Sequence, residues 1–244
     1  LCGAAWFEAA FRQLDPDVRI EWLVHDGDRM PAGSTVCRLA GNARALVTAE
    51  RSALNFLQLL SATATVTSRY ADAIAGTRTR VLDTRKTLPG LRRAQKYAVL
   101  CGGGTNHRIG LFDAMMLKEN HIIAAGCIPA AIAAARRIHP ALPLIVEVET
   151  LDELAQVLDA GADRALLDNF TPEMLTEAVT FTAGRMPLEV SGNVEIDTIR
   201  AIAETGVDFI SSGALTKNVR AIDLSLRLDV KHEGACGPAD AATH

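Results

Sequence analysis

The stretch LIVEVETLDELAQVLDAGADRALLDN, residues 144–169, contains one complete unit of the predicted fold. Its first apolar run, Leu144–Val146, is short enough for a buried strand, and Ala165–Leu167 repeats the pattern. Between them, Leu151–Ala160 has apolar residues at the spacing of an amphipathic helix. A strand, a helix and a second strand in this order predict two parallel strands joined by a crossover helix.

The same alternation extends in both directions along the chain. The predicted strands are the short apolar runs Arg80–Leu82, Ala114–Leu117, Leu144–Val146, Ala165–Leu167, Leu188–Val190 and Val207–Ile210. The helical stretches between the later runs are Pro129–Ile138, Leu151–Ala160, Pro172–Thr182 and Glu195–Glu204. Repeated βα units indicate a parallel sheet. Because the runs are fewer than the eight strands of a standard barrel, the pattern is compatible with a barrel or with an open sheet.

The beginning of the chain has a different pattern. Trp6–Leu14 is a predicted helix, and the short runs Arg19–Val24 and Val36–Leu39, separated by turns, predict a small β-rich lobe. Ala43–Tyr70 is free of turn signals and has apolar residues at helical spacing, so we expect one long helix there.

These patterns divide the chain into three parts. We expect a partial N-terminal α/β lobe over residues 1–50, an α/β domain over residues 51–231 and a disordered tail over residues 232–244. The sequence starts with Leu1 rather than Met, so we also expect that an N-terminal segment precedes it in the natural protein.

Composition excludes several classes of protein. Hydrophobic residues make up 49% of the 244 residues, which favours a real core over disorder. The net charge is -4 and no run of Lys or Arg suggests a nucleic-acid partner. No apolar stretch approaches the roughly 20 residues that span a bilayer. The five cysteines form no CxxC pair, which argues against a disulfide framework or a structural zinc site and predicts a cytoplasmic location.

Polar or charged residues follow each predicted strand. They are Asp83-Thr84-Arg85-Lys86, Lys118-Glu119-Asn120-His121, Glu147 with Glu149, Asp168-Asn169, Ser191-Gly192-Asn193 and Ser211-Ser212-Gly213. In βα folds the carboxyl ends of parallel strands meet at one edge, where functional groups gather. The joint pattern therefore predicts a site at that edge.

Three chemical types occur among these and nearby residues. The cations are Arg85, Lys86, His107, Arg108 and Lys118. They favour an anionic substrate, because Arg binds carboxylates and phosphates bidentately and Lys supplies a point charge. Glu147 and Asp168 offer oxygen donors for Mg²⁺ held through substrate phosphates and water. The two Ser/Gly turns could hold a phosphate with backbone N–H groups.

Each motif also has a purely structural interpretation. Asp83–Lys86 alone could be an ordinary turn, and Glu147 could be a solvated strand residue. Cys101–Gly104 lacks the Gly-Lys-Ser/Thr ending of a P-loop, so we interpret it as a flexible turn. The functional interpretation depends on all the motifs occurring together.

The ordered motifs resemble those of the quinolinate phosphoribosyltransferases. The similar segments are Glu50–Asn55, Leu82–Arg92, Lys96–Val99, Gly102–Arg108, Leu117–His121, Glu147–Glu149, Leu167–Phe170, Ser191–Asn193 and Gly213–Thr216. The resemblance covers almost the whole chain up to about Leu228. It implies an open, roughly six-stranded α/β barrel with an N-terminal α/β lobe that is apparently truncated here, and a homodimer with active sites at the subunit interface.

The resemblance also implies the reaction and the cofactor. The chain would be a pentosyltransferase that converts quinolinate and phosphoribosyl pyrophosphate into nicotinate mononucleotide, pyrophosphate and CO₂, with Mg²⁺, as a step of NAD synthesis. Two features depart from the family pattern. Asn218 stands where members often have His, and it cannot carry charge. The chain also begins well inside the usual N-terminal lobe.

The resemblance gives each site residue an expected role. Residues expected to bind the carboxylates of quinolinate are Arg85, His107, Arg108 and Lys118, together with the partner subunit's Arg51. Residues expected to act in catalysis are Lys86, Glu147 and Asp168, the last two also on the ribose hydroxyls and the metal–pyrophosphate. Residues expected on the 5-phosphate are Ser191, Gly192, Asn193, Ser212 and Gly213, and Thr84 completes the substrate-binding set.

Three rival functions are compatible with parts of the pattern. A related paralogue associated with molybdate-transport genes has the same fold, but the full cationic set favours quinolinate. Nicotinate phosphoribosyltransferase would need fewer cations, because nicotinate has one carboxylate. A non-catalytic binding protein would be expected to have lost Glu147, Asp168 or Ser191–Asn193, all of which are present.

Overall fold

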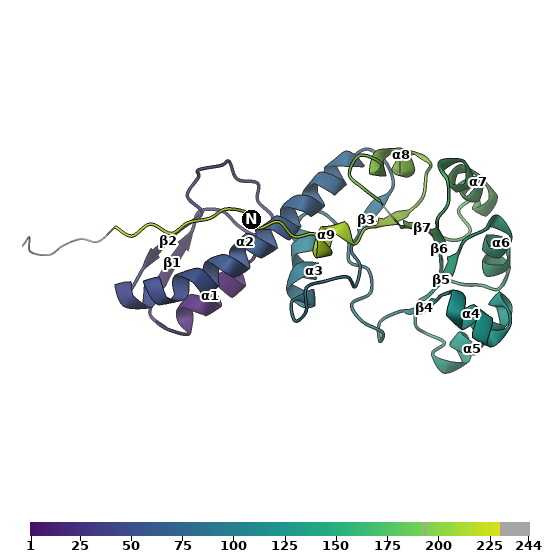
Figure 1. Ribbon diagram of the computed structural model, residues 1–244, viewed down its shortest axis with the longest axis horizontal. Helices are drawn as coiled ribbons and strands as arrows, with labels where there is room; N and C mark the ends of the chain where they lie inside the picture. Colours follow the sequence, from purple (N-terminus) through teal and green to yellow (C-terminus); the bar gives the residue numbers. More distant parts are fainter. Residues whose placement is uncertain (193, 230–244) are drawn as a thin grey trace, which may run out of the picture.

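The computed structural model describes residues 1–192 and 194–229. It has a small N-terminal lobe and a larger α/β part, and a long helix runs through both (Figure 1). The lobe contains helix α1 (Ala4–Arg12) and the antiparallel strands β1 (Arg19–Trp22) and β2 (Cys37–Ala40). The predicted β-rich lobe is therefore confirmed.

Helix α2 (Ala43–Ala73) is the longest element, with 31 residues. Asn42 caps it by accepting hydrogen bonds from the backbone N–H groups of Arg44 and Ala45. Its first half packs in the core of the lobe, whereas Tyr70 near its end packs in the core of the larger part. The predicted long helix is confirmed, and the predicted boundary between residues 50 and 51 lies inside it.

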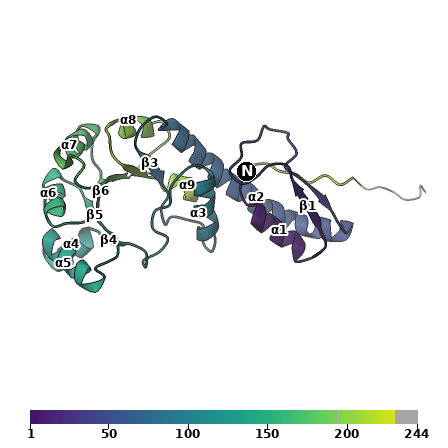
Figure 2. The same ribbon diagram turned by 180° about the vertical axis from the view of Figure 1, so that it is seen from behind.

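The larger part contains a six-stranded parallel sheet with the strand order β3-β8-β7-β6-β5-β4. Its strands are β3 (Arg80–Leu82), β4 (Met115–Leu117), β5 (Leu144–Val148), β6 (Arg164–Asp168), β7 (Leu188–Ser191) and β8 (Phe209–Ser211). Each of the six predicted runs is a strand. The edges β3 and β4 are not hydrogen-bonded to each other among the described residues, so the sheet is an open, curved one (Figures 1 and 2).

Helices cover the outer face of this sheet (Figure 2). They are α4 (Glu119–Ala125), α5 (Ile128–Ile138), α6 (Leu151–Asp159), α7 (Pro172–Thr182) and α8 (Ile199–Glu204), while α3 (Arg92–Cys101) and the short α9 (Ala214–Lys217) lie near α2. Helix α8 begins four residues later than predicted, because Glu195–Thr198 forms a turn in which Thr198 bonds back to Glu195.

Helix α3 was not predicted, and its burial explains why. Its buried face includes Gln95 and Lys96, which dilute the apolar periodicity that identifies a helix. Both side chains have partners inside the protein: Gln95 donates to the backbone oxygen of Thr216 at 2.8 Å, and Lys96 is paired with Asp83.

Strand residues alternate between two environments. Leu144, Val146 and Val148 of β5 lie in the hydrophobic core beneath the helices. Because successive side chains of a strand point to opposite faces, Glu147 lies on the inner face of the curved sheet. The same alternation places Arg164 and Asp168 of β6 and Glu189 of β7 on that inner face, which therefore carries several charged groups.

Residues 83–114 connect the two edge strands. Thr105 forms an isolated parallel bridge with Leu82, which extends the sheet beyond β3. The predicted turn at Cys101–Gly104 is present, but close packing rather than flexibility explains Gly102 and Gly104, while Gly103 has a φ of 82°. A Cβ atom on Gly104 would lie 2.7 Å from Cγ2 of Thr67 and 2.8 Å from Cγ1 of Val99.

The end of the described chain returns to the lobe. Gln58 of α2 accepts a hydrogen bond from the backbone of Ile222 and donates one to Leu224, and Leu224 packs against the core of the lobe. The predicted disordered tail, 232–244, lies outside the described residues. Within the described residues no single helix is long and apolar enough to cross a bilayer, and α4 with α5 reaches that length only as a pair bent by 94°.

Candidate active site

The register of the sheet brings the predicted motifs to one edge. Leu82 at the end of β3 pairs with Ser211 of β8, and Asp168 of β6 pairs with Ser191 of β7. The segments that follow these strands therefore start side by side. The structure thus gathers the polar strand ends, as the sequence predicted.

Two carboxylates and two lysines lie close together at this edge. Lys118 forms an ion pair with Glu147. Burial and the charge of Glu147 raise the pKa of Asp168, while Lys118 and Lys86 oppose that rise. Because the charge of Glu147 acts on Asp168, a cation bound between the two carboxylates would be stabilised.

Gly192 keeps the end of β7 next to Asp168. Its φ of 97° is in the left-handed region, and a Cβ atom at this position would lie 3.0 Å from Oδ1 of Asp168. On the other side, Asn169 has a φ of 58° and donates to Oδ2 of Asp168 at 3.2 Å. The turn thus fixes the carboxylate beside Ser191 and Gly192. The next predicted residue, Asn193, lies outside the described residues.

The first and last motifs of the domain also meet. A Cβ atom on Gly213 would lie 3.0 Å from Cδ of Lys86 and 3.5 Å from Oγ1 of Thr84. The hydroxyl of Thr216 donates to the backbone oxygen of Lys86 at 2.7 Å. Thr84 accepts a hydrogen bond from the backbone N–H of Lys86 at 3.1 Å. Lys86, Thr84 and Gly213 therefore form one continuous surface.

A buried ion pair holds the backbone of His107. Asp83 accepts a hydrogen bond from the His107 N–H at 2.8 Å, and Nζ of Lys96 donates to the His107 carbonyl at 2.8 Å. Asp83 and Lys96 also pair with each other, and both side chains are almost completely buried. The sequence analysis did not assign either residue a role beyond its motif.

Arg108 presents a cationic group beside Arg85. Its guanidinium donates to the backbone oxygen of Ala114 at 3.0 Å. Burial and the nearby charge of Arg85 lower the pKa of Arg108, so the two cations repel each other in this structure. An anion placed between them would remove that repulsion.

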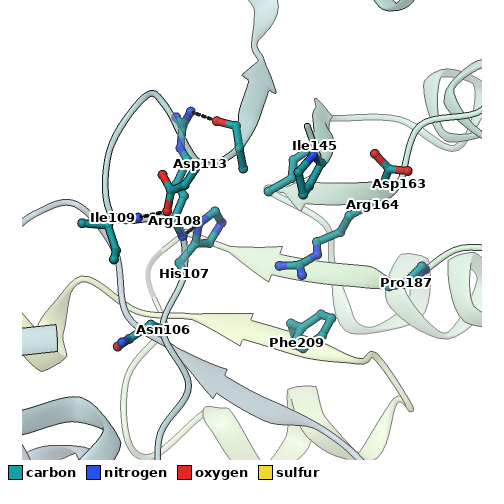
Figure 3. A pocket seen from close by; sticks show the side chains of 12 residues that line it. Asn106, His107, Arg108, Ile109, Asp113, Ile145, Asp163, Arg164, Pro187 and Phe209 are labelled. Atoms are coloured by element: carbon teal, nitrogen blue, oxygen red, sulfur yellow. Dashed lines mark hydrogen bonds between the residues drawn. The ribbon is translucent and has the colours of Figure 1, made fainter. Parts of the chain in front are cut away.

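Glu189 lies between Arg164 and His107 and contacts both. Figure 3 shows Arg164 and His107, which line the same cavity. Arg164 pairs with Glu189 at 2.9 Å and lies 4.1 Å from the ring centre of Phe209. The other oxygen of Glu189 lies 3.3 Å from Nε2 of His107, close but poorly aligned for a hydrogen bond. Burial opposes ionisation of Glu189, yet contacts with His107 and Arg164 outweigh it and lower the pKa of Glu189.

The second ring nitrogen of His107 is also engaged. Nδ1 accepts a hydrogen bond from the backbone N–H of Arg108 at 2.6 Å, so the proton of a neutral ring lies on Nε2. His107 as a quinolinate ligand stays a prediction, and one of its ring nitrogens would have to change partner. Together with Arg108, Arg164 and Phe209, it lines a cavity of about 420 Å³.

Two domain families account for most of the chain. The N-terminal domain of quinolinate phosphoribosyl transferase matches residues 1–61, and the C-terminal domain of the same enzyme matches residues 63–227. The chain belongs to the quinolinate phosphoribosyltransferase family. The predicted family and fold are therefore confirmed, and the boundary between the two matches lies within α2.

Relatives in this family are similar over most of their length. A tobacco protein named quinolinate phosphoribosyltransferase [decarboxylating] 2b, mitochondrial, is 43% identical over 95% of this chain and 71% of its own length. The carboxylating nicotinate-nucleotide pyrophosphorylase of Mycobacterium leprae is 43% identical over 86% of this chain and 75% of its own. The solved structure of the nicotinate-nucleotide pyrophosphorylase from Francisella tularensis has a TM-score of 0.91 and 52% identity, covering 92% of this chain and 80% of that one.

One predicted site residue, Arg51, lies apart from the larger α/β part of the structure. It is exposed on the half of α2 whose buried residues, such as Ala49 and Leu54, pack in the core of the lobe. The other described site residues belong to the strand ends or to the segment between β3 and β4.

Sequence reasoning missed Glu189 and Arg164, although a signal was present. Glu189 lies between Leu188 and Val190 in an apolar run, so the alternation of a strand places it on the opposite face. A charged residue at an inward position of a parallel strand needs a partner, and Arg164 occupies an inward position on the neighbouring strand.

Proposed function

We propose that the chain transfers the phosphoribosyl group of phosphoribosyl pyrophosphate to the ring nitrogen of quinolinate. The products are nicotinate mononucleotide, pyrophosphate and CO₂, in NAD synthesis. Relatives that are 43% identical carry names for this activity. The observation that carries the proposal is that Lys118 pairs with Glu147 beside Asp168, where Lys86 also lies, at the carboxyl edge of the sheet.

The cations fit a dicarboxylate substrate. Arg108 is fixed by its bond to Ala114, and its repulsion from Arg85 would be relieved by a carboxylate between the two guanidinium groups. Lys118 would supply a point charge to the second carboxylate by leaving its pair with Glu147. A substrate with two carboxylates uses all three groups, whereas nicotinate would leave part of this charge unpaired.

The carboxylates fit the second substrate and Mg²⁺. Glu147 lies close enough to Asp168 for its charge to raise the pKa of Asp168. Both side chains offer carboxylate oxygens, which are the ligands that Mg²⁺ prefers. We propose that they hold the ribose hydroxyls and, through water and pyrophosphate, the metal. When bound, Mg²⁺ would neutralise the charge on the departing pyrophosphate. Ser191, Gly192, Ser212 and Gly213 would bind the 5-phosphate, with Asn193 as the remaining predicted member.

Catalysis by this site would depend on positioning and charge. As pyrophosphate departs, positive charge develops on the ribose, and the carboxylates of Glu147 and Asp168 would stabilise it. Lys86 would lie near the phosphoribosyl pyrophosphate, since it borders Gly213. The quinolinate nitrogen attacks with its own lone pair, so the step needs no general base. The resulting ring cation accepts the electron pair released when the 2-carboxylate leaves as CO₂, and C2 then takes up a proton.

We also propose a homodimer in which the partner subunit's Arg51 completes the quinolinate site. Support comes from the exposed position of Arg51 on the lobe half of α2, away from the strand ends of its own chain. A cytoplasmic location stays a prediction, and it rests on the scattered cysteines. The tobacco relative is named mitochondrial, so the names of relatives do not support that location.

The test is product formation by the purified chain. Quinolinate, phosphoribosyl pyrophosphate and Mg²⁺ should yield nicotinate mononucleotide and CO₂ in equal amounts, and chelation of the metal should stop both. Nicotinate in place of quinolinate should give no product. A folded sample that binds phosphoribosyl pyrophosphate but releases no CO₂ from quinolinate would refute the proposed activity and favour the paralogue.

A further inference from the structure

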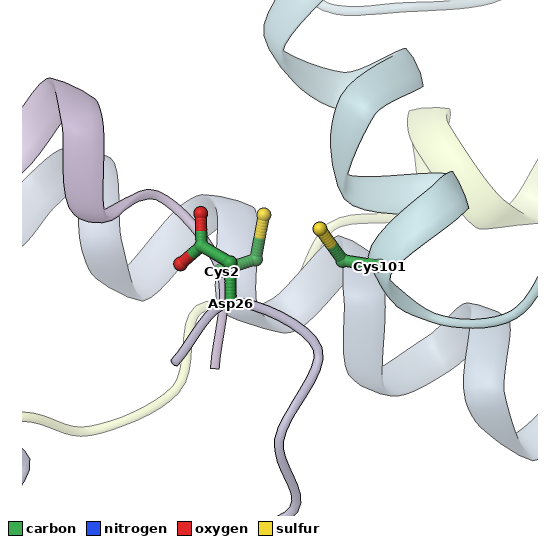
Figure 4. A group of neighbouring side chains, drawn as sticks. All are labelled: Cys2, Asp26 and Cys101. Carbon is green, nitrogen blue, oxygen red and sulfur yellow. The ribbon is translucent and has the colours of Figure 1, made fainter. Parts of the chain in front are cut away.

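Two cysteines and an aspartate meet where the lobe joins the larger part (Figure 4). Sγ of Cys2, Sγ of Cys101 and a carboxylate oxygen of Asp26 all lie within 4.8 Å of one another. Cys2 precedes α1 and Asp26 follows β1, whereas Cys101 ends α3. Cys2 is completely buried, while Cys101 and Asp26 are half-buried, so the cluster is open to solvent on one side.

The backbones that carry both thiols are fixed on helix α2. The hydroxyl of Ser61 accepts a hydrogen bond from the Cys2 N–H at 2.9 Å and donates to the Cys2 carbonyl at 3.1 Å. Next to Cys101, Gly102 packs so closely on Ala64 of α2 that a Cβ atom would collide with the Ala64 carbonyl. The two sulfur atoms are therefore held near each other by the fold and not by their own side chains.

Asp26 is also fixed before any ligand binds. Its Oδ1 accepts hydrogen bonds from the backbone N–H groups of Gly3 and Ala4, at 3.0 and 3.2 Å, and thereby caps α1. Its Oδ2 accepts a hydrogen bond from the hydroxyl of Tyr97 at 3.0 Å. Outer hydrogen bonds of this kind orient the carboxylates that ligate metals. Oδ1 already accepts two hydrogen bonds, whereas Oδ2 accepts one and keeps a lone pair for a metal ion.

We propose that Cys2, Cys101 and Asp26 bind one zinc ion, with water as the fourth ligand. Zinc accepts thiolate and carboxylate ligands in a tetrahedral arrangement, whereas Mg²⁺ prefers oxygen alone. Zn–S bonds of about 2.3 Å place tetrahedral ligand atoms roughly 3.5–3.8 Å apart. The three ligand atoms lie within 4.8 Å of one another, so they need to move only slightly closer together to bind the ion. The ion would tie the start of the chain to the end of α3.

Cobalt substitution tests the proposal, because Co²⁺ bound by thiolates has a charge-transfer band in the near ultraviolet. The full chain, reduced and freed of metal, should bind one equivalent of Co²⁺ with this band, and Zn²⁺ should displace it. Cys101→Ser removes one of the two thiolates, so it should weaken the band and lower the affinity by about 100-fold. Asp26→Asn should weaken binding while keeping an acceptor for the cap of α1.

Cys127 provides a matched control. Cys127→Ser changes an exposed thiol elsewhere, so this variant should keep the band. Added Zn²⁺ should raise the Tm of the parent and of Cys127→Ser but not of Cys101→Ser. A Co²⁺ spectrum without the thiolate band, or unchanged binding by Cys101→Ser, would overturn the proposal. So would a Cys2–Cys101 disulfide in protein kept under reducing conditions.

Discussion

Replacing Lys96 by Met keeps the length of a buried side chain and removes its charge. The side chains of Lys96 and Asp83 are 2% and 0% exposed, so the substitution leaves the Asp83 carboxylate buried without its cation. Removing one partner of a buried ion pair costs about 3–5 kcal/mol. We expect the free energy of unfolding of Lys96→Met to fall by that amount.

The same substitution should weaken quinolinate use. Lys96 also donates to the His107 carbonyl, so its loss releases one of the two bonds that fix this backbone segment next to Arg108. A hydrogen bond to a charged group contributes about 1.5–3 kcal/mol. We therefore expect kcat/KM for quinolinate to fall about 10- to 100-fold. The KM for phosphoribosyl pyrophosphate should change much less.

Urea unfolding followed by circular dichroism gives the stability, and Arg29→Met is the matched control. Arg29 and Asp72 form an ion pair with side chains 74% and 56% exposed, whose loss should cost only about 0–1 kcal/mol. The double variant Asp83→Asn/Lys96→Met should lose less stability than the two single variants added together, because it leaves no buried charge. Equal costs for Lys96→Met and Arg29→Met, or strict additivity, would refute the reasoning.

Three further outcomes are expected. Glu189→Gln should lower the free energy of unfolding most at neutral pH, because the lowered pKa of Glu189 makes its charge stabilising above the unfolded-state pKa of about 4.3. The difference in free energy of unfolding between Glu189→Gln and the parent should shrink as the pH falls through the folded-state pKa of Glu189. Denaturant titrations over a range of pH measure this difference, and a constant difference across the range would contradict the prediction. Gly213→Ala should raise the KM for phosphoribosyl pyrophosphate with little change in Tm, since the new Cβ would lie 3.0 Å from Cδ of Lys86; steady-state kinetics with an unchanged KM would show that Lys86 moves aside freely. Mixing inactive Arg51→Ala with inactive Arg85→Ala should restore about a quarter of the sites by forming heterodimers, and no recovery in the product assay would count against a shared site.

Much of the fold could be predicted from the sequence because each strand has a compact apolar run between turn signals. Leu144–Val148 and Arg164–Asp168 illustrate this, since their alternate residues fill the core beneath the helices. Helix α3 could not be predicted in the same way. Its buried side chains Gln95 and Lys96 are satisfied by partners outside the helix, and periodicity cannot show such partners.

The candidate site was predictable to the extent that its residues follow strands. Lys118 and Glu147 meet because adjacent parallel strands place their ends together. The hydrogen bonds that hold the backbone of His107 could not be predicted, because they depend on the ion pair between Lys96 of α3 and Asp83. The spacing of the cysteines in the sequence also did not indicate that Cys2 and Cys101 are neighbours. The fold brings these two residues together, although Cys2 precedes α1 and Cys101 ends α3.

Helix α2 has a mechanical consequence for the whole molecule. At about 1.5 Å per residue, its 31 residues form a rod of roughly 46 Å whose two ends are embedded in different cores. If α2 unfolds where it packs in one core, it also loses helical structure in the other core. We therefore expect the lobe and the larger α/β part to unfold in a single step. Recombination between relatives at the junction of the two matched domains, residues 61–63, would cut this rod in its middle. Exchange of lobes between family members should therefore succeed at Asn42 or beyond Ala73, where the rod begins and ends, and fail in between.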